Sequence, residues 1–140
     1  DAADAAILVA NCPVCHQSVA LAARLLEASG IASVVMGCAR DIVEHIGVPR
    51  YVFSDLPLGN AAGKPGDPRS QRDTLEMALG LLESAEQARC TAVSPQVWSA
   101  TSTWKLDYSN AERLTPEELQ RRRAEFDAAK AQAKVIREER

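Results

Sequence analysis

The sequence has no apolar run near the length of about 18 residues that a membrane-spanning helix needs, so no such helix is predicted. No signal peptide is visible, but a processed or truncated N-terminus stays open because the chain starts at Asp1 instead of Met. The net charge is only −3 at pH 7, which provides no electrostatic reason for binding nucleic acid or an anionic membrane. The four cysteines are too few for a disulfide scaffold and fit a reducing cytoplasm with reactive thiols.

What the sequence does contain is ordinary for one globular domain. It has 140 residues, of which 46% are hydrophobic and 25% charged. A chain of this length buries a real but small core. These values are typical of a soluble globular protein and leave its function to local motifs.

The most informative stretch is a pair of cysteines between a strand and a helix. Residues 7–10 form a short apolar run bounded by turn formers, which predicts a buried strand. From Ser18 onward, apolar residues recur at helical spacing, at Val19, Ala22, Ala23 and Leu26, which predicts a helix. Cys12 and Cys15 therefore lie where a strand feeds a helix.

This location favours thiolate chemistry, because free N–H groups and the positive dipole end at a helix N-terminus stabilise an anion. A Cys-x-x-Cys pair in this setting has a lowered thiol pKa. We expect Cys12 to be the more reactive thiol, since Cys15 lies further into the first turn, and His16 to add a positive charge or a proton relay. Pro13 fits a first helical turn, where its missing N–H breaks no bond.

Three other interpretations of this motif stay open. In the first interpretation, the two cysteines are half of a zinc site. Cys38, His45 and Cys90 supply no second pair of ligands at a suitable spacing, which argues against it. Residues 12–16 also match the Cys-x-x-Cys-His pattern of covalent haem attachment, against which the preceding strand argues. Two buried core cysteines are the third interpretation, although the turn around them is polar.

The rest of the first part alternates strands and helices. The predicted helices span 18–29, 39–46 and about 67–83, and the predicted strands span 31–36, 51–53 and 91–93. Gly30 and Gly47 supply helix stops, and Asp67 or Ser70 caps the third helix. Short links between strand and helix predict parallel strands with right-handed crossovers. The predicted fold is α/β: a small doubly wound (Rossmann- or flavodoxin-like) parallel sheet with a C-terminal helical extension.

Such a sheet binds ligands at the carboxyl ends of its strands. These ends carry Cys12, then Cys38 and Arg40, and then Asp55, so we predict that they converge on one rim. The glycine- and proline-rich loop 55–68 follows, and we interpret it as a rigid arch over that rim. Asn60 and Lys64 in this loop are candidates for holding a carboxylate. The predicted substrate-binding residues are thus Cys38, Arg40, Asp55, Asn60 and Lys64.

The C-terminal part differs in character, which predicts a division into 1–93, the α/β domain, and 94–140. Residues 91–110 are rich in Ser and Thr and contain Trp98, Trp104 and Tyr108. We expect these aromatic side chains to cover a pocket, to bind a partner or to pack on the core of their own domain. Thr115 and Pro116 start a helix that runs to about Arg137. It carries a narrow apolar stripe of Leu119, Phe126 and Ala133. This stripe is expected to pack on its own domain or on a second copy, so a homo-oligomer is predicted.

Taken together, several motifs resemble the selenoprotein B family of glycine, sarcosine and betaine reductases and of D-proline reductase. The resemblance covers residues 7–83 and lies in the motifs at 12–19, 39–44, 47–50 and 55–60. In those reductases a selenocysteine attacks a substrate carbon, releases an amine and is regenerated by thiols. The resemblance implies that Cys12 stands at the reactive position and Cys15 is its resolving partner. With no selenocysteine, the chain is interpreted as a cysteine-containing, shortened homologue that acts on another substrate.

Two hypotheses from different classes follow. The first is a thiol-dependent oxidoreductase or thiol transferase, in which Cys12 attacks a small organic substrate, Cys15 resolves the intermediate and a thiol reductant or partner subunit restores the thiols. It uses Cys12, Cys15 and His16 as catalytic residues and needs neither metal nor cofactor beyond its redox thiols. The second is a non-catalytic interaction module that binds metal or haem through the same three residues.

Overall fold

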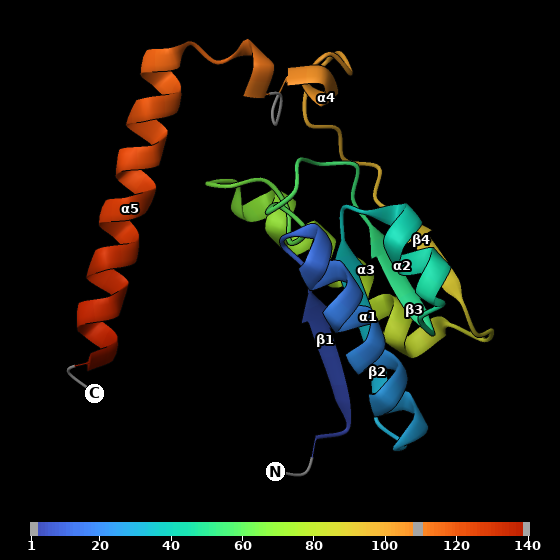
Figure 1. Cartoon of the computed structure of the whole chain (residues 1–140). Coiled ribbons are helices and arrows are strands. Elements are labelled where there is room, and N and C mark those ends of the chain that lie inside the picture. Colours follow the sequence, from blue (N-terminus) through green and yellow to red (C-terminus); the bar gives the residue numbers. More distant parts are fainter. Residues whose placement is uncertain (1–2, 108–110, 139–140) are drawn as a thin grey trace. The chain divides into compact units, whose positions relative to one another are not determined.

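The computed structural model describes residues 3–107 and 111–138. Four parallel strands form one sheet in the order β1-β2-β3-β4: β1 Ala5–Val9, β2 Ala32–Gly37, β3 Arg50–Phe53 and β4 Cys90–Val93. The helices are α1 Pro13–Ala28, α2 Arg40–Ile46, α3 Pro68–Ser84, α4 Trp104–Asp107 and α5 Pro116–Glu138, with a 3-10 turn at Ala111–Arg113 (Figure 1). This confirms the predicted small doubly wound α/β sheet with a C-terminal helix.

The helix boundaries follow from their caps. α1 begins at Pro13, earlier than the predicted Ser18, because Cys12 serves as its N-cap and the proline fits the first turn. α3 is capped by Asp67, whose carboxylate accepts the Ser70 N–H at 3.0 Å. α2 ends at Gly47, which adopts the left-handed conformation of a helix stop at φ 78°.

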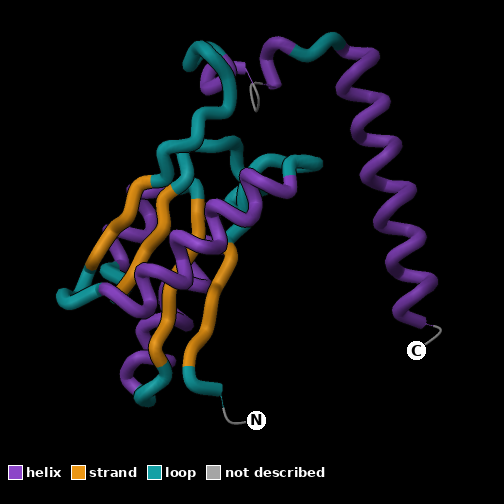
Figure 2. Tube along the Cα trace, turned by 180° about the vertical axis from the view of Figure 1, so that it is seen from behind, coloured by secondary structure: helices purple, strands orange, loops and turns teal. Residues whose placement is uncertain are grey.

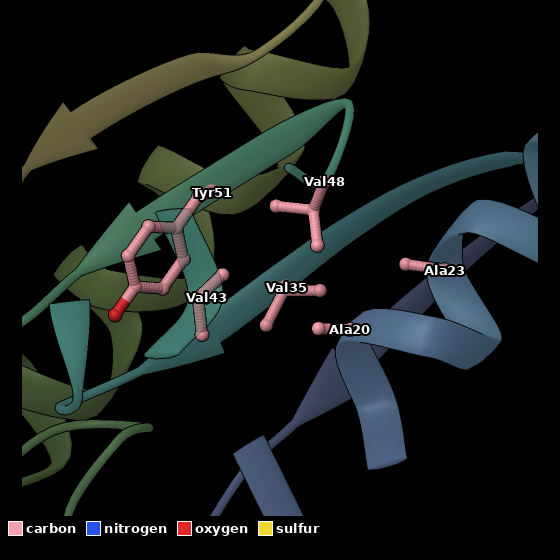
Figure 3. Close-up of a cluster of buried hydrophobic side chains, with 6 residues drawn as sticks. All are labelled: Ala20, Ala23, Val35, Val43, Val48 and Tyr51. Atoms are coloured by element: carbon pink, nitrogen blue, oxygen red, sulfur yellow. The ribbon is translucent and has the colours of Figure 1, made fainter. Parts of the chain in front are cut away.

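Helices cover both faces of the sheet. α1 and α2 share one face, where Ala20, Ala23 and Val43 pack against Val35 and Tyr51 (Figure 3). A helix on the other face can be followed in the Cα trace (Figure 2). This helix, α3, contributes Ala78 and Leu81 to a cluster with Val34, Met36 and Val52. Alternation along β2 explains the division, since Val34 and Met36 point to one face and Val35 to the other. Each face of the sheet therefore buries its own cluster of hydrophobic side chains.

The connection through α3 leaves part of one face of β1 open. All the strands are parallel and follow chain order, but α3 lies on the face opposite α1 and α2. The β3–α3–β4 connection therefore has the opposite hand to the two before it, which is uncommon. α3 packs chiefly on β2 and β3. On the α3 side of β1, Val9 stays 43% exposed.

An ionic cluster joins α1 to the amino ends of two strands. Glu27 Oε1 accepts the Ser33 backbone N–H at 2.5 Å and a charged hydrogen bond from Arg50 Nη1 at 2.7 Å. Ser33 Oγ, which is buried, also donates to the carbonyl of Ala23. One carboxylate thus satisfies polar groups from both β2 and β3, which ties the end of α1 to the sheet.

The chain divides into two compact units, Asp1–Ala100 and Thr101–Arg140. In the second unit, Thr115 caps α5 by accepting the Glu118 N–H at 3.2 Å, as predicted. Leu119 and Phe126 of the predicted stripe are 45% and 64% exposed. The Ala133 side chain and Tyr108 lie outside the described residues. The homo-oligomer stays a prediction. None of the described helices combines the length and the apolar character needed to cross a membrane.

The ionic cluster generates a stability prediction. Glu27→Ala removes the acceptor of the Ser33 N–H and the counter-charge of Arg50, and should lower the free energy of unfolding by about 1–3 kcal/mol. Urea denaturation measures the change. Glu83→Ala, an exposed glutamate of α3, is the matched control and should change stability little. Equal losses in the two variants would show that the cluster adds nothing to stability.

Candidate active site at the carboxyl end of the sheet

The two motif cysteines lie in the first turn after β1. Cys12 is exposed and adopts an extended conformation at the N-cap, and its Sγ accepts the backbone N–H of Cys15 at 3.2 Å. Cys15 is less exposed, and the two sulfur atoms are 2.6 Å apart. A sulfur that accepts a helix N-terminal N–H is favoured as a thiolate. The turn thus holds an accessible thiol and a second thiol against it.

Hydrogen bonding within the pair lowers a thiol pKa. The pKa of Cys15 lies below its ordinary value, first because of the hydrogen bond with the Cys12 side chain and then because of the Cys12 backbone. Cys15 therefore carries thiolate at a lower pH than an ordinary cysteine.

His16 lies beneath this turn and is fully buried. Its Nε2 accepts two backbone N–H groups, from Cys38 at 2.9 Å and from Ala39 at 3.1 Å. Nε2 therefore carries the lone pair, and the Nδ1–H donates to the carbonyl oxygen of Cys12 at 2.7 Å. Both ring nitrogens are engaged by the backbone. In this geometry His16 positions the turn, and the predicted proton relay would require one of these bonds to break.

Gly37, the last residue of β2, makes room for this ring. A Cβ at Gly37 would lie 2.8 Å from His16 Cδ2 and 3.3 Å from a ring carbon of Tyr51. The imidazole consequently sits between the ends of β1 and β2, with one hydrogen bond to Cys12 and one to Cys38. The structure thus brings the backbones of Cys12 and Cys38 together, which the strand order alone left open.

Cys38 itself has a different environment from the pair. Burial raises the pKa of its thiol to about 11, against the opposing effect of backbone hydrogen bonds from Leu56 and Asn60. These two residues belong to the glycine- and proline-rich loop, so the loop does reach Cys38. Asp55, which is exposed, adds a negative potential that raises the pKa further. Cys38 is therefore a protonated thiol under the loop at neutral pH.

Two of the remaining predicted substrate-binding residues, Arg40 and Lys64, make contacts of their own. Arg40 lies on α2, pairs with Glu44 at 2.9 Å and stacks 5.8 Å over the Phe53 ring. Lys64 contributes its backbone, since its N–H donates to Ser70 Oγ at 2.8 Å and its carbonyl accepts from Gln71. The grouping of Arg40 with the loop residues around one substrate stays a prediction. Carboxylate binding by Lys64 stays a prediction.

The loop fits tightly on α3 and bounds a cavity. Gly63 has φ 107°, and a Cβ there would lie 2.8 Å from the Gln71 backbone, so only glycine fits. The Asn60 side-chain amide donates to the Pro57 carbonyl at 2.9 Å and fixes the turn. Between β1, the loop and α3 is a cavity of about 560 Å³, lined by Ile7, Val9, Asn11, Met36, Gly59, Asn60, Ala62, Gly63, Pro65, Gln71 and Leu75. We call it the β1 cavity.

The sequence analysis identifies few of the residues that line the β1 cavity. It predicts only Asn60 among them as a binding residue. The available signal was the period of two along the first strand, which puts Ile7, Val9 and Asn11 on one face. A second cavity of about 560 Å³ lies between α1 and α2 and includes Leu21, Asp41 and His45. The β1 cavity is the one that includes Asn11, the neighbour of Cys12.

The geometry also bears on metal and haem binding. In the part of the chain that the structure describes, no three His, Cys, Asp or Glu side chains are grouped so as to hold a metal ion. Haem attachment through Cys12 and Cys15 would use His16 as an iron ligand, but the backbone engages both of its ring nitrogens. The arrangement therefore favours the thiol interpretation of the motif.

The fold and the site together define a small parallel α/β unit with a paired-thiol turn at the end of its edge strand. The chain is similar to D-proline reductase subunit gamma of Acetoanaerobium sticklandii, with 35% identity over 69 residues. The match covers 49% of this chain and 28% of the relative. No family model and no solved structure matches the chain. The chain is thus distantly related to a reductase subunit, and the finer resemblance to selenoprotein B stays a prediction.

The shifted thiol pKa values predict different pH dependences of alkylation. A lowered pKa keeps the Cys15 thiolate present at lower pH, so iodoacetamide should modify Cys15 at a lower pH than it modifies an ordinary cysteine. Cys12 should be modified fastest at neutral pH because it is the most exposed of the four thiols. Cys38, with a pKa of about 11, should react only in strongly alkaline solution. Peptide mapping at several pH values tests this. Fast labelling of Cys38 at neutral pH would contradict it.

The two sides of the His16 ring can be tested separately. His16→Gln retains an acceptor near the Nε2 position, whereas His16→Asn retains a donor near Nδ1 and leaves the N–H groups of Cys38 and Ala39 without an acceptor. The Cys12 carbonyl keeps a second donor, the His16 backbone N–H, at 3.0 Å.

His16→Asn should therefore destabilise the fold more than His16→Gln, by about 1–3 kcal/mol for the orphaned donors. The free energies of unfolding in urea decide the question. If the Asn variant is as stable as the Gln variant or more stable, the hydrogen bonds to Nε2 do not contribute to the stability of the fold.

Proposed function

We propose that this chain is part of a thiol-dependent, reductase-related enzyme in which Cys12 is the nucleophile and Cys15 the resolving thiol. The observation that carries the proposal is the turn itself: an exposed Cys12 sulfur that accepts a helix N-terminal N–H and lies 2.6 Å from a second thiol. The distant relationship to a D-proline reductase subunit supports a reductive role.

The two thiols together supply two electrons. The Cys12 thiolate attacks an electrophilic substrate carbon, forms a C–S bond and expels the leaving group with its electron pair. The Cys15 thiolate then attacks Cys12 Sγ, and the C–S bond breaks so that the carbon departs with the electron pair and takes a proton from water. The substrate carbon is reduced and the two cysteines are oxidised to a disulfide.

This chemistry defines the reaction partners by class. The second step requires a carbon that stabilises negative charge, so we propose substrates whose leaving group lies next to a carbonyl. A dithiol reductant or a partner subunit restores the thiols, which fits a reducing cytoplasm. The named relative is a subunit, and the present chain spans 28% of its length, so a partner that completes the site is part of the proposal.

Removal of the resolving thiol should trap the intermediate. With 2-bromoacetophenone, the native protein should release acetophenone and lose two hydrogens as the Cys12–Cys15 disulfide forms. Cys15→Ser should stop at a stable adduct on Cys12, because the turn no longer holds a second thiol that can attack the Cys12 sulfur. Intact mass and product chromatography measure both outcomes.

Cys90→Ser is the matched control, because Cys90 lies on β4 away from the turn, and it should behave as the native protein does. Acetophenone release by a Cys12→Ser variant at the native rate would refute the nucleophile assignment. If the disulfide instead joins Cys12 to Cys38, the resolving role of Cys15 is refuted.

A further inference from the structure

We propose that the β1 cavity binds the substrate of the Cys12 thiol and selects an uncharged molecule with an apolar body and N–H or O–H donors. The inference rests on the proposed function, because it assigns a ligand class to the same site. The site would then consist of the thiols of the turn and, on the α3 side of the sheet, a pocket that determines substrate specificity.

The position and size of the cavity suit this role. Asn11 lines it and is the residue directly before Cys12, so the cavity extends to the residue next to the nucleophile. Its volume of about 560 Å³ lies within the range of small-molecule sites. It exists because α3 packs on β2 and β3 and leaves this side of β1 to the loop.

The lining explains why the ligand should be uncharged. Among the described residues, none of those that line it is ionisable, and Ile7, Val9, Met36 and Leu75 give it an apolar surface. The positive end of α3 is nearby, but the Asp67 carboxylate already accepts the Ser70 N–H there. That end therefore offers no uncompensated charge to an anionic ligand. A carboxylate entering this cavity would lose its hydration without gaining an ion pair.

The polar groups of the lining include two partly committed amides. The Asn60 amide nitrogen donates to the Pro57 carbonyl, and the Gln71 amide nitrogen donates to the Lys64 carbonyl at 3.1 Å. Each bond uses one of the two N–H donors of its amide, so each side chain can offer a ligand its carbonyl oxygen as an acceptor and one remaining N–H. A ligand with an amide N–H or a hydroxyl beside an apolar group would match them.

Reagents that differ in charge and apolar surface test the pocket directly. Rates of Cys12 modification by iodoacetamide, N-benzyliodoacetamide and iodoacetate are measured by mass spectrometry, each relative to its rate with glutathione. If the cavity binds the benzyl amide, the normalised rate of N-benzyliodoacetamide should exceed that of iodoacetamide about tenfold, which corresponds to about 1.4 kcal/mol. Iodoacetate should show no gain.

Substitutions in the two cavities show which of them causes the rate preference for the benzyl amide. Leu75→Glu puts a charge in the β1 cavity and should abolish the tenfold preference while iodoacetamide still reacts. The matched control is Leu21→Glu, an exposed helical leucine that lines the cavity between α1 and α2, and it should keep the preference. Leu75→Gln, which adds no charge, should weaken the preference and serves if the Glu variant does not fold.

The outcomes separate this inference from the proposed function. Equal normalised rates for the two amides at a reactive Cys12, or a preference lost only in Leu21→Glu, would overturn the pocket assignment and leave the nucleophile assignment standing. Failure of Cys12 to react with any of the three reagents would overturn the proposed function itself.

Discussion

The site depends on one buried imidazole between two strand ends. The His16 ring accepts from the N–H groups that follow β2 and donates to the carbonyl of Cys12 after β1. A neutral ring with one donor and one acceptor nitrogen is the side chain that can do both across this gap. Gly37 is required beside it because a Cβ would overlap the ring. The backbones of the exposed Cys12, which caps α1, and of the partly buried Cys38 are therefore fixed relative to one another.

The two cysteine environments show how burial and hydrogen bonding act in opposite directions. At the exposed turn, hydrogen bonding within the pair lowers the pKa of Cys15, whereas a few residues of loop above Cys38 raise its pKa to about 11. The same end of the sheet thus carries two thiols, Cys15 and Cys38, whose pKa values are shifted in opposite directions. The difference comes from the hydrogen bond with the Cys12 side chain at one site and from burial at the other.

The placement of α3 explains the asymmetry of the sheet. On one face α1 and α2 cover Val35 and Tyr51 closely, and on the other α3 covers Met36 and Val52 but leaves Val9 half exposed. The loop that crosses to this face is held by Gly63 against α3 and closes the end of the open space. The cavity is a consequence of how this connection crosses the sheet.

The sequence by itself determined the alternation of elements, the parallel fold class and the thiols at a strand-to-helix turn, because these depend on local periodicity and caps. Gly47 marks a helix stop in this local way, whereas the start of α1 at Pro13 lies five residues before the predicted Ser18, where the apolar periodicity begins. Only the tertiary structure decided the role of His16, whose partners Cys38 and Ala39 lie more than twenty residues away. It also decided that Asn60 lines the β1 cavity, because the face on which α3 packs is set by long-range contacts. No local pattern encodes that choice.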